Sequence, residues 1–155
     1  MRGRPSGFEY SLMINAAPTR VLAAFFEPQA LARWWQVVRS VTTPRVLGVY
    51  AVEWAPSPEP DEVLGRLGGV FHGTVAEYIS GKELFVADAW WLPPDGEPLG
   101  PMALEVRCEM DGPGCRLTVR QGGVDDTPRW QRYYGVIGHG WRASLAALKE
   151  YMEHA

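Results

Sequence analysis

The sequence predicts an α+β fold in which an antiparallel sheet packs on one long C-terminal helix. Three observations lead to this prediction. Strand-like segments follow one another without an intervening helical pattern, the last part of the chain has the periodicity of an amphipathic helix, and two proline-initiated segments follow the first strand. Strands in an uninterrupted run with helices outside that run are typical of antiparallel α+β domains.

The chain begins with a predicted strand over residues 8–15, followed by two short helices. Pro18 and Pro28 each suit the first turn of a helix, where the missing N–H has no partner to lose. The first helix is expected to bury four apolar side chains, namely Val21, Leu22, Phe25 and Phe26. The second is expected to run through Leu31 into Trp34 and Trp35.

Six further strands are predicted from segments rich in β-branched and aromatic residues. They cover residues 37–42, 49–54, 69–79, 83–91, 103–110 and 115–121. The turn at residues 111–114 joins the last two of them, so that Met110 should pair with Cys115. Two proline-rich segments, residues 55–68 and 92–101, are predicted to be surface loops. Loops of this length are either lids over a binding site or tolerated insertions.

Residues 128–153 are predicted to form the long helix, with Thr127 as its N-cap. Its apolar residues fall on one narrow stripe at about 100° per residue. They are Trp130, Tyr134, Ile137, Trp141, Leu145, Leu148 and Met152. Gly135, Gly138 and Gly140 interrupt the helix, each at a cost of about 1 kcal/mol relative to alanine. Tertiary packing must therefore hold this helix. Gly138, at the edge of the stripe, is expected to leave room for a ligand or for a neighbouring ring such as Trp54 or Trp90.

Length and composition favour a single domain over residues 8–153, preceded by a flexible tail over residues 1–7. The net charge is −3 and basic residues are scattered, which argues against nucleic-acid binding. A signal peptide and a membrane-spanning segment are not expected, so the predicted location is the cytoplasm. Cys108 and Cys115 are expected to be reduced thiols. Neither a metal site nor a cofactor is predicted.

The sequence contains none of the common catalytic motifs, and the glycine-rich stretch at residues 135–140 lies inside the helix. Three ionisable residues in strands remain as candidates for chemistry. If Phe71, Val75 and Ile79 faced inward, His72 would face outward and Glu77 would face inward with a raised pKa. The alternative is that Glu77, near the strand end, reaches solvent. The orientation of Asp88 is left open.

Several motifs together resemble those of the activator of heat-shock protein 90 ATPase-like family, within the START-like or SRPBCC superfamily (polyketide cyclase, Bet v-type). The opening motif comprises Ala17, Pro18, Val21, Phe25, Pro28, Leu31, Trp34 and Trp35. The central and closing motifs comprise residues 73–77, Glu83, Leu84, Trp90, residues 115–119, Gly140, Trp141, Leu145 and Leu148. The resemblance implies a helix-grip fold, in which a curved sheet of six to seven strands wraps around the C-terminal helix and encloses a cavity.

The chain has seven Trp, more aromatic bulk than a small, closely packed core needs. Together with the implied cavity, this excess predicts a binding protein for a small hydrophobic or aromatic ligand. The expected cavity residues are Tyr50, Trp54, Phe71, Val75, Trp90, Leu104, Val106, Leu117, Tyr134, Ile137, Gly138 and Trp141.

Two alternatives remain beside ligand binding. One is a cyclase-, aromatase- or hydrolase-type enzyme that uses His72, Glu77 or Asp88 in the same cavity. The other is an activator of a chaperone ATPase, which the name of the family suggests. The expected partner is a small hydrophobic molecule, and the chain could form a homodimer.

Overall fold

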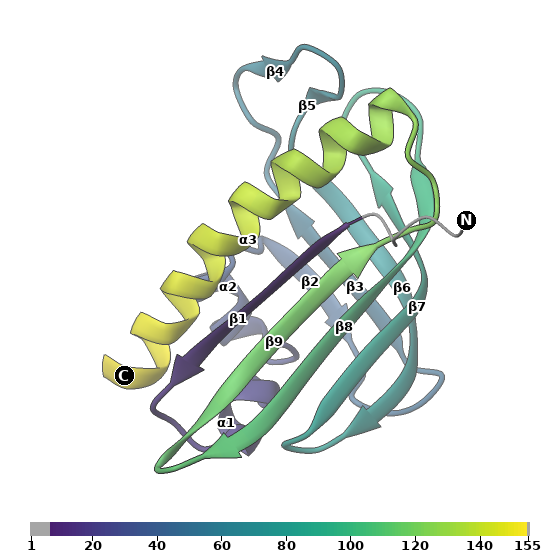
Figure 1. The fold of residues 1–155 in the computed structure, drawn as a ribbon. Coiled ribbons are helices and arrows are strands. Elements are labelled where there is room, and N and C mark those ends of the chain that lie inside the picture. Colours follow the sequence, from purple (N-terminus) through teal and green to yellow (C-terminus); the bar gives the residue numbers. More distant parts are fainter. Residues whose placement is uncertain (1–6, 155) are drawn as a thin grey trace, which may run out of the picture.

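The computed structural model describes residues 7–154 and contains a seven-stranded antiparallel sheet that curves around one long helix (Figure 1). The strand order is β1-β9-β8-β7-β6-β3-β2. The strands are β1 (Phe8–Ile14), β2 (Arg39–Thr42), β3 (Val49–Trp54), β6 (Gly69–Ile79), β7 (Glu83–Leu92), β8 (Leu99–Asp111) and β9 (Gly114–Gly122). A separate two-stranded ribbon comprises β4 (Pro60–Asp61) and β5 (Gly65–Arg66). The predicted helix-grip fold is confirmed.

Three helices complete the fold: α1 (Pro18–Ala23), α2 (Pro28–Trp34) and α3 (Pro128–His154). Helix α3 crosses the concave side of the sheet, with α1 and α2 toward its C-terminal end and the β4–β5 ribbon toward its N-terminal end (Figure 1). The Thr127 hydroxyl oxygen accepts a hydrogen bond from the Trp130 amide at 3.4 Å, as expected of an N-cap. No helix among residues 7–154 has the length and apolar character needed to span a bilayer.

The expected elements agree with the structure apart from details at their ends and the β4–β5 ribbon, which lies within the loop predicted over residues 55–68. Helix α1 ends before Phe25 and Phe26, which are nevertheless buried. The loop predicted over residues 92–101 is shorter, because β8 already begins at Leu99. Met110 pairs with Cys115 as predicted, and both cysteines are free and buried. Of the tail predicted over residues 1–7, all but Gly7 lies outside the described residues.

One β-bulge in β6 and one in β7 reverse the in–out alternation of the residues considered for the site. In β6 the register shifts between Val75 and Glu77, so Tyr78 rather than Ile79 packs against the core. In β7 the register shifts between Val86 and Ala89, where Asp88 adopts φ 51°. An extra residue in one strand of a pair changes which face the later side chains occupy. The condition that Phe71, Val75 and Ile79 share the inward face therefore does not hold at Ile79, whose side chain is 46% exposed.

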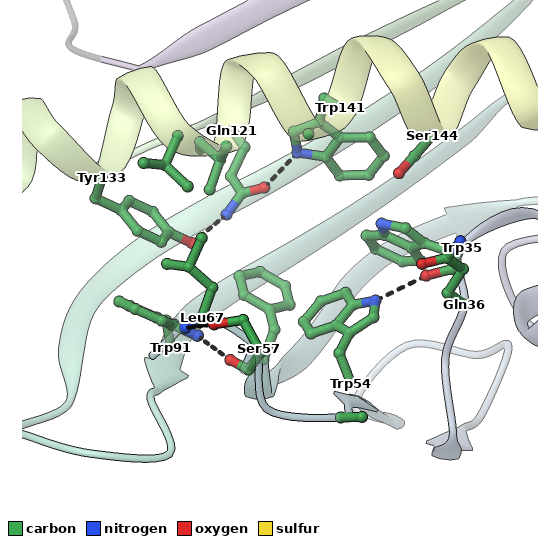
Figure 2. Close-up of a pocket in the computed structure, with 16 residues that line it drawn as sticks. Trp35, Gln36, Trp54, Ser57, Leu67, Trp91, Gln121, Tyr133, Trp141 and Ser144 are labelled. Carbon is green, nitrogen blue, oxygen red and sulfur yellow. Dashed lines mark hydrogen bonds between the residues drawn. The ribbon is translucent and has the colours of Figure 1, made fainter. Parts of the chain in front are cut away.

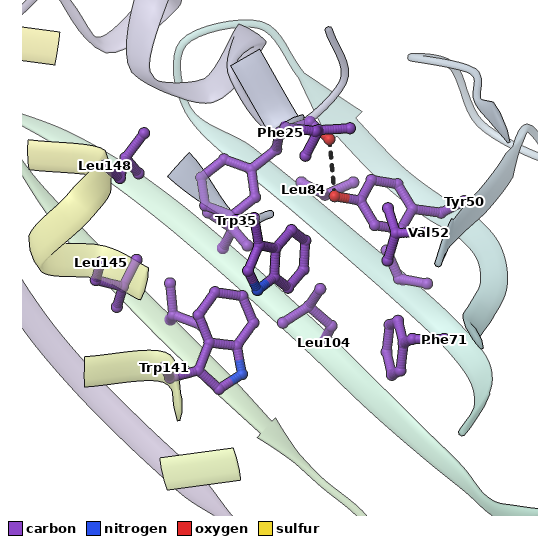
Figure 3. Close-up of a cluster of buried hydrophobic side chains, with 14 of the residues drawn as sticks. Phe25, Trp35, Tyr50, Val52, Phe71, Leu84, Leu104, Trp141, Leu145 and Leu148 are labelled. Carbon is purple, nitrogen blue, oxygen red and sulfur yellow. Dashed lines mark hydrogen bonds between the residues drawn. The ribbon is translucent and has the colours of Figure 1, made fainter. Parts of the chain in front are cut away.

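The hydrophobic core fills the space between the sheet and α3 at the end beside α1 and α2. Trp141, Leu145 and Leu148 of α3 pack there against side chains of the sheet and of the short helices (Figure 3). The Tyr50 hydroxyl donates a 2.7 Å hydrogen bond to the Phe25 carbonyl, which ties β3 to the segment after α1. This dense end leaves the other half of α3, toward its N-terminus, to border the pocket described below.

Candidate functional site

A pocket of about 390 Å³ lies between the N-terminal half of α3, the ends of β3, β6 and β7, and the loop that carries β4 and β5 (Figure 2). Its sixteen lining residues come from segments far apart in the sequence. They are Trp35, Gln36, Trp54, Ala55, Ser57, Leu67, Gly68, Phe71, Trp91, Gln121, Tyr133, Val136, Ile137, Gly140, Trp141 and Ser144. Gln36, Ala55 and Gly140 are exposed, so the pocket opens to solvent at these residues.

Indole rings form much of the pocket wall. The Trp54 indole N–H donates to the Trp35 carbonyl at 2.9 Å, and that of Trp91 donates to the Gly68 carbonyl at 2.7 Å. The Trp35 and Trp141 rings lie 4.8 Å apart between centroids, and Trp91 stacks on Tyr133 at 5.2 Å. Since both of these N–H groups are satisfied by the protein, Trp54 and Trp91 present mainly apolar surface to the pocket.

Gln121 is the buried polar residue of the wall. Its side-chain oxygen accepts the Trp141 indole N–H at 2.7 Å, and its side-chain nitrogen donates to the Tyr133 hydroxyl at 2.9 Å. The same nitrogen lies 3.3 Å from the Met102 sulfur. Burial raises the pKa of Tyr133 well above its ordinary value, although the hydrogen bond from Gln121 opposes this shift. The phenol is therefore neutral, and none of the sixteen lining side chains is charged.

Ion pairs fasten the loops around the pocket. The Arg132 guanidinium of α3 donates to Asp61, with 2.9 Å between Nε and Oδ1. Asp61 also accepts the amides of Val63 and Leu64, each at 3.0 Å. Hydrogen bonds from Arg132 are the main cause that lowers the pKa of Asp61 below its ordinary value. The loop of residues 55–68, which supplies four lining residues, is thereby attached directly to α3.

The second proline-rich loop joins the same network. Arg66 pairs with Asp95 at 2.9 Å, which connects β5 to the segment after β7. From α3, Arg129 donates to the carbonyls of Glu97 and Pro98. The two loops are thus bonded to each other, and each is also bonded to α3. The loop of residues 55–68 forms part of the pocket wall.

Of the residues expected to line the cavity, Trp54, Phe71, Ile137 and Trp141 lie at the pocket. Five others are fully buried in the core on the sheet: Tyr50, Val75, Leu104, Val106 and Leu117. They face inward as the strand alternation predicts, but surrounding side chains fill the space over them.

Trp90, Tyr134 and Gly138 also lie outside the pocket lining. The bulge at Asp88 turns Trp91 inward, and Trp90 instead covers the backbone of Gly100, where an added Cβ would lie 2.5 Å from its ring. The Tyr134 hydroxyl donates to the Asp125 carbonyl at 2.9 Å, beyond the rim. Gly138 meets Phe8 of β1, with 3.1 Å between an added Cβ and the Phe8 ring, and Gly140 is the glycine at the pocket.

Sequence reasoning missed Gln121 and Tyr133, although a signal for Gln121 was present. Cys115, Leu117 and Val119 alternate along β9 on the buried face, and continuing this pattern by two residues places Gln121 on the same face. Tyr133 directly precedes Tyr134, which is a member of the expected apolar stripe. It belongs to a second helix face, which also carries Val136, Ile137, Gly140 and Ser144.

The ionisable residues considered for catalysis do not reach the pocket. Glu77 and Asp88 are exposed, and His72 lies on the opposite face of β6 from Phe71. The bulge between Val75 and Glu77 turned the Glu77 side chain outward. Among residues 7–154 no group of three or more His, Cys, Asp or Glu is arranged to hold a metal ion.

Several solved structures share this fold. Protein CV1439 from Chromobacterium violaceum is 24% identical, with coverage of 97% of this chain and 100% of that one and a TM-score of 0.69. The Aha1 dimer from Colwellia psychrerythraea, a solution structure, is 14% identical over 95% and 96% of the two chains, with a TM-score of 0.63. DynU16, from the dynemicin biosynthetic locus, is 16% identical over 95% of this chain and 47% of its own, with a TM-score of 0.62.

Sequence comparison identifies the family. No curated protein sequence matches the chain. The family model described as "Activator of Hsp90 ATPase homolog 1-like protein" matches residues 15–153, which is nearly the whole chain and includes every strand from β2 onward, all three helices and every residue at the pocket. The chain therefore belongs to the activator of Hsp90 ATPase homolog 1-like family.

Proposed function

We propose that the protein binds a small, uncharged, largely aromatic molecule in the pocket between α3 and the sheet. The observation that carries this proposal is a volume of about 390 Å³ walled by four indole rings, with no charged lining side chain. Pockets for small ligands commonly have about 300–1,000 Å³ and a mainly apolar lining with few polar groups. Tryptophan faces suit the flat rings of an aromatic ligand.

The lack of a charged lining group also favours binding over catalysis at this site. General acid–base catalysis requires a titratable group within hydrogen-bonding reach of the reacting atoms. His72, Glu77 and Asp88 do not line the pocket, and Tyr133 is held neutral by burial. A binding role makes use of the features of the wall without requiring such a group.

Binding can be tested with prodan, an uncharged naphthalene ketone whose emission shifts to the blue in apolar surroundings. We expect the protein to bind prodan, and Gly140→Leu to weaken binding about tenfold or more, equivalent to about 1.4 kcal/mol. Gly140 lines the pocket and nothing lies within 4 Å of an added Cβ, so the leucine side chain has space to occupy there.

Gly135→Leu is the matched control. Gly135 is exposed on the same helix, also has nothing within 4 Å of an added Cβ, and is not part of the pocket. Both variants exchange a helical glycine for a better helix former, so neither should lose stability through the helix itself. If prodan did not bind, or bound equally to both variants, the pocket would not be the binding site.

A further inference from the structure

We propose that the Tyr133 hydroxyl donates a hydrogen bond to the ligand, and that the pocket therefore selects aromatic molecules carrying an uncharged acceptor, such as a ketone oxygen. This inference rests on the binding function proposed above and adds the chemical feature that the ligand must present. It follows from the direction of the hydrogen bonds around Gln121, which Figure 2 shows as a chain from Trp141 to Tyr133.

The indole of Trp141 fixes the direction of this chain. An indole N–H can only donate, so the atom of Gln121 that faces it at 2.7 Å must be the carboxamide oxygen. The other end of the carboxamide, 2.9 Å from Tyr133, is then the NH₂ group, which can also only donate. The Tyr133 oxygen is consequently an acceptor toward Gln121, and its own proton must point elsewhere.

Within residues 7–154 no protein group accepts the Tyr133 proton. The only hydrogen bond of its hydroxyl among these residues is the one received from Gln121. The Tyr133 side chain is nonetheless almost completely buried, with 4% of its surface exposed, and lies in the pocket wall. The acceptor for this proton must therefore come from outside the protein, either from water in the open pocket or from a bound ligand.

Trp35 also indicates that the pocket favours a ligand with hydrogen-bond acceptors. Its indole N–H has no acceptor among the described residues, although the ring is only 9% exposed. No fully buried side-chain nitrogen or oxygen in this part of the chain lacks a partner, so the Trp35 nitrogen must border open space. Trp35 lines the pocket across from Tyr133 (Figure 2). Both groups are donors for which the described residues provide no acceptor, and a ligand rich in donors would leave them unpaired.

The charge of the acceptor is constrained as well. A carboxylate would accept these hydrogen bonds, but no lining side chain provides a compensating positive charge. Moving an uncompensated ion into an apolar site is far more costly than moving a neutral carbonyl group. A neutral carbonyl oxygen is therefore the acceptor that this wall favours.

The pair 9-fluorenone and fluorene tests the inference, because the two flat molecules differ in a carbonyl group against a methylene group. Their affinities are measured by displacement of prodan from the wild type, from Tyr133→Phe and from Tyr134→Phe. We expect the wild type to prefer fluorenone about three- to tenfold, the value of one hydrogen bond. Tyr133→Phe should abolish this preference, so that fluorenone and fluorene bind this variant with affinities equal within about twofold.

Tyr134→Phe is the matched control, because it removes a hydroxyl from the neighbouring helical residue, which bonds to Asp125 and Gly123 and not to the pocket. It should retain the preference. Comparing the ratio of two ligands within each variant cancels any general loss of stability.

The outcomes separate this inference from the proposed function. If both compounds displace prodan equally from the wild type, the pocket binds aromatic molecules and the acceptor selection is wrong. If the preference persists in Tyr133→Phe, the assignment to Tyr133 is overturned. If neither compound displaces prodan and Gly140→Leu does not affect prodan binding, the proposed function itself fails, and the inference fails with it.

Discussion

Asp88 determines which tryptophan of β7 faces the pocket. Its φ of 51° lies in the left-handed region, which aspartate enters more readily than most residues. The register with β8 shifts at this point, so that Val86 and Ala89 both face inward although they are three positions apart. Trp91 follows Ala89 by two positions and therefore reaches the pocket wall, where it stacks on Tyr133.

Replacing Asp88 should show how much the left-handed conformation contributes to the stability of the fold. We expect Asp88→Val to lower the free energy of unfolding by about 1–3 kcal/mol, since a β-branched residue is strained at positive φ. Asp88→Gly should be neutral or slightly stabilising, because glycine adopts this conformation without a steric cost. Urea denaturation measures both variants.

Glu109→Val is the control for the Asp88 variants, because Glu109 is an exposed acidic residue of the neighbouring strand β8 with no positive φ. It should change stability by no more than about 0.5 kcal/mol. Equal stabilities of Asp88→Val and Asp88→Gly would show that the backbone conformation at residue 88 is not the constraint.

Helix α3 has two adjacent functional faces. One packs on the sheet and on α2 through Trp130, Leu145 and Leu148, and the other borders the pocket through Tyr133, Ile137 and Ser144. Trp141 lies where the two faces meet, since it belongs both to the core and to the pocket wall.

The sequence predicted the packing face of α3 because burial of apolar side chains produces a strong periodic signal. The pocket face is mixed, containing Gly140 and Ser144 among apolar residues, and so it has no comparable periodic signal. The strands show the same contrast. The alternation in β8 correctly placed Leu104 and Val106 inward. The bulges in β6 and β7 depend on local backbone geometry: they decide the orientation of Glu77, for which the sequence left two alternatives, and they reverse the orientation expected of Trp90.

The glycines of α3 should respond differently to alanine. Gly135→Ala is expected to raise the free energy of unfolding by up to about 1 kcal/mol, because the residue is exposed and nothing lies within 4 Å of the new methyl group. Gly138→Ala should gain less, since its methyl group would lie 3.1 Å from the Phe8 ring and would push β1 away from the helix. Equal gains in urea denaturation would show that Phe8 adjusts freely.

At the scale of the whole molecule, polar contacts on the surface hold the apolar pocket closed along one side. The loop of residues 55–68 supplies Leu67 and Gly68 to the wall, and its attachment to α3 is the pair between Asp61 and Arg132. Asp61 is nearly covered, with 6% of its side chain exposed, whereas Arg132 is 51% exposed. The contact is therefore accessible to solvent on one side, and opening it would not require the core to be disrupted.

The pair between Asp61 and Arg132 predicts how the stability of the folded protein depends on pH. Because the pKa of Asp61 is lowered in the folded protein, chiefly by Arg132, ionised Asp61 stabilises the fold at pH values above the ordinary aspartate pKa of about 3.9. That stabilisation is lost as the pH falls through the lowered value in the folded protein. In a carboxyl ¹³C NMR titration, Asp61 should remain ionised at pH 4, where an ordinary aspartate is about half protonated.

Arg132→Gln should change both the pKa of Asp61 and the rate at which prodan dissociates. In this variant the pKa of Asp61 should rise toward the ordinary value, because the hydrogen bonds from Arg132 are lost. Prodan should dissociate several times faster, because the loop of residues 55–68 loses its attachment to α3. Arg116→Gln is the control, since Arg116 forms an exposed pair with Asp111 at the β8–β9 hairpin, whose residues are not part of the pocket. It should leave the dissociation rate unchanged. A rise in the Asp61 pKa without faster dissociation would show that the ion pair stabilises the loop but does not control access to the pocket.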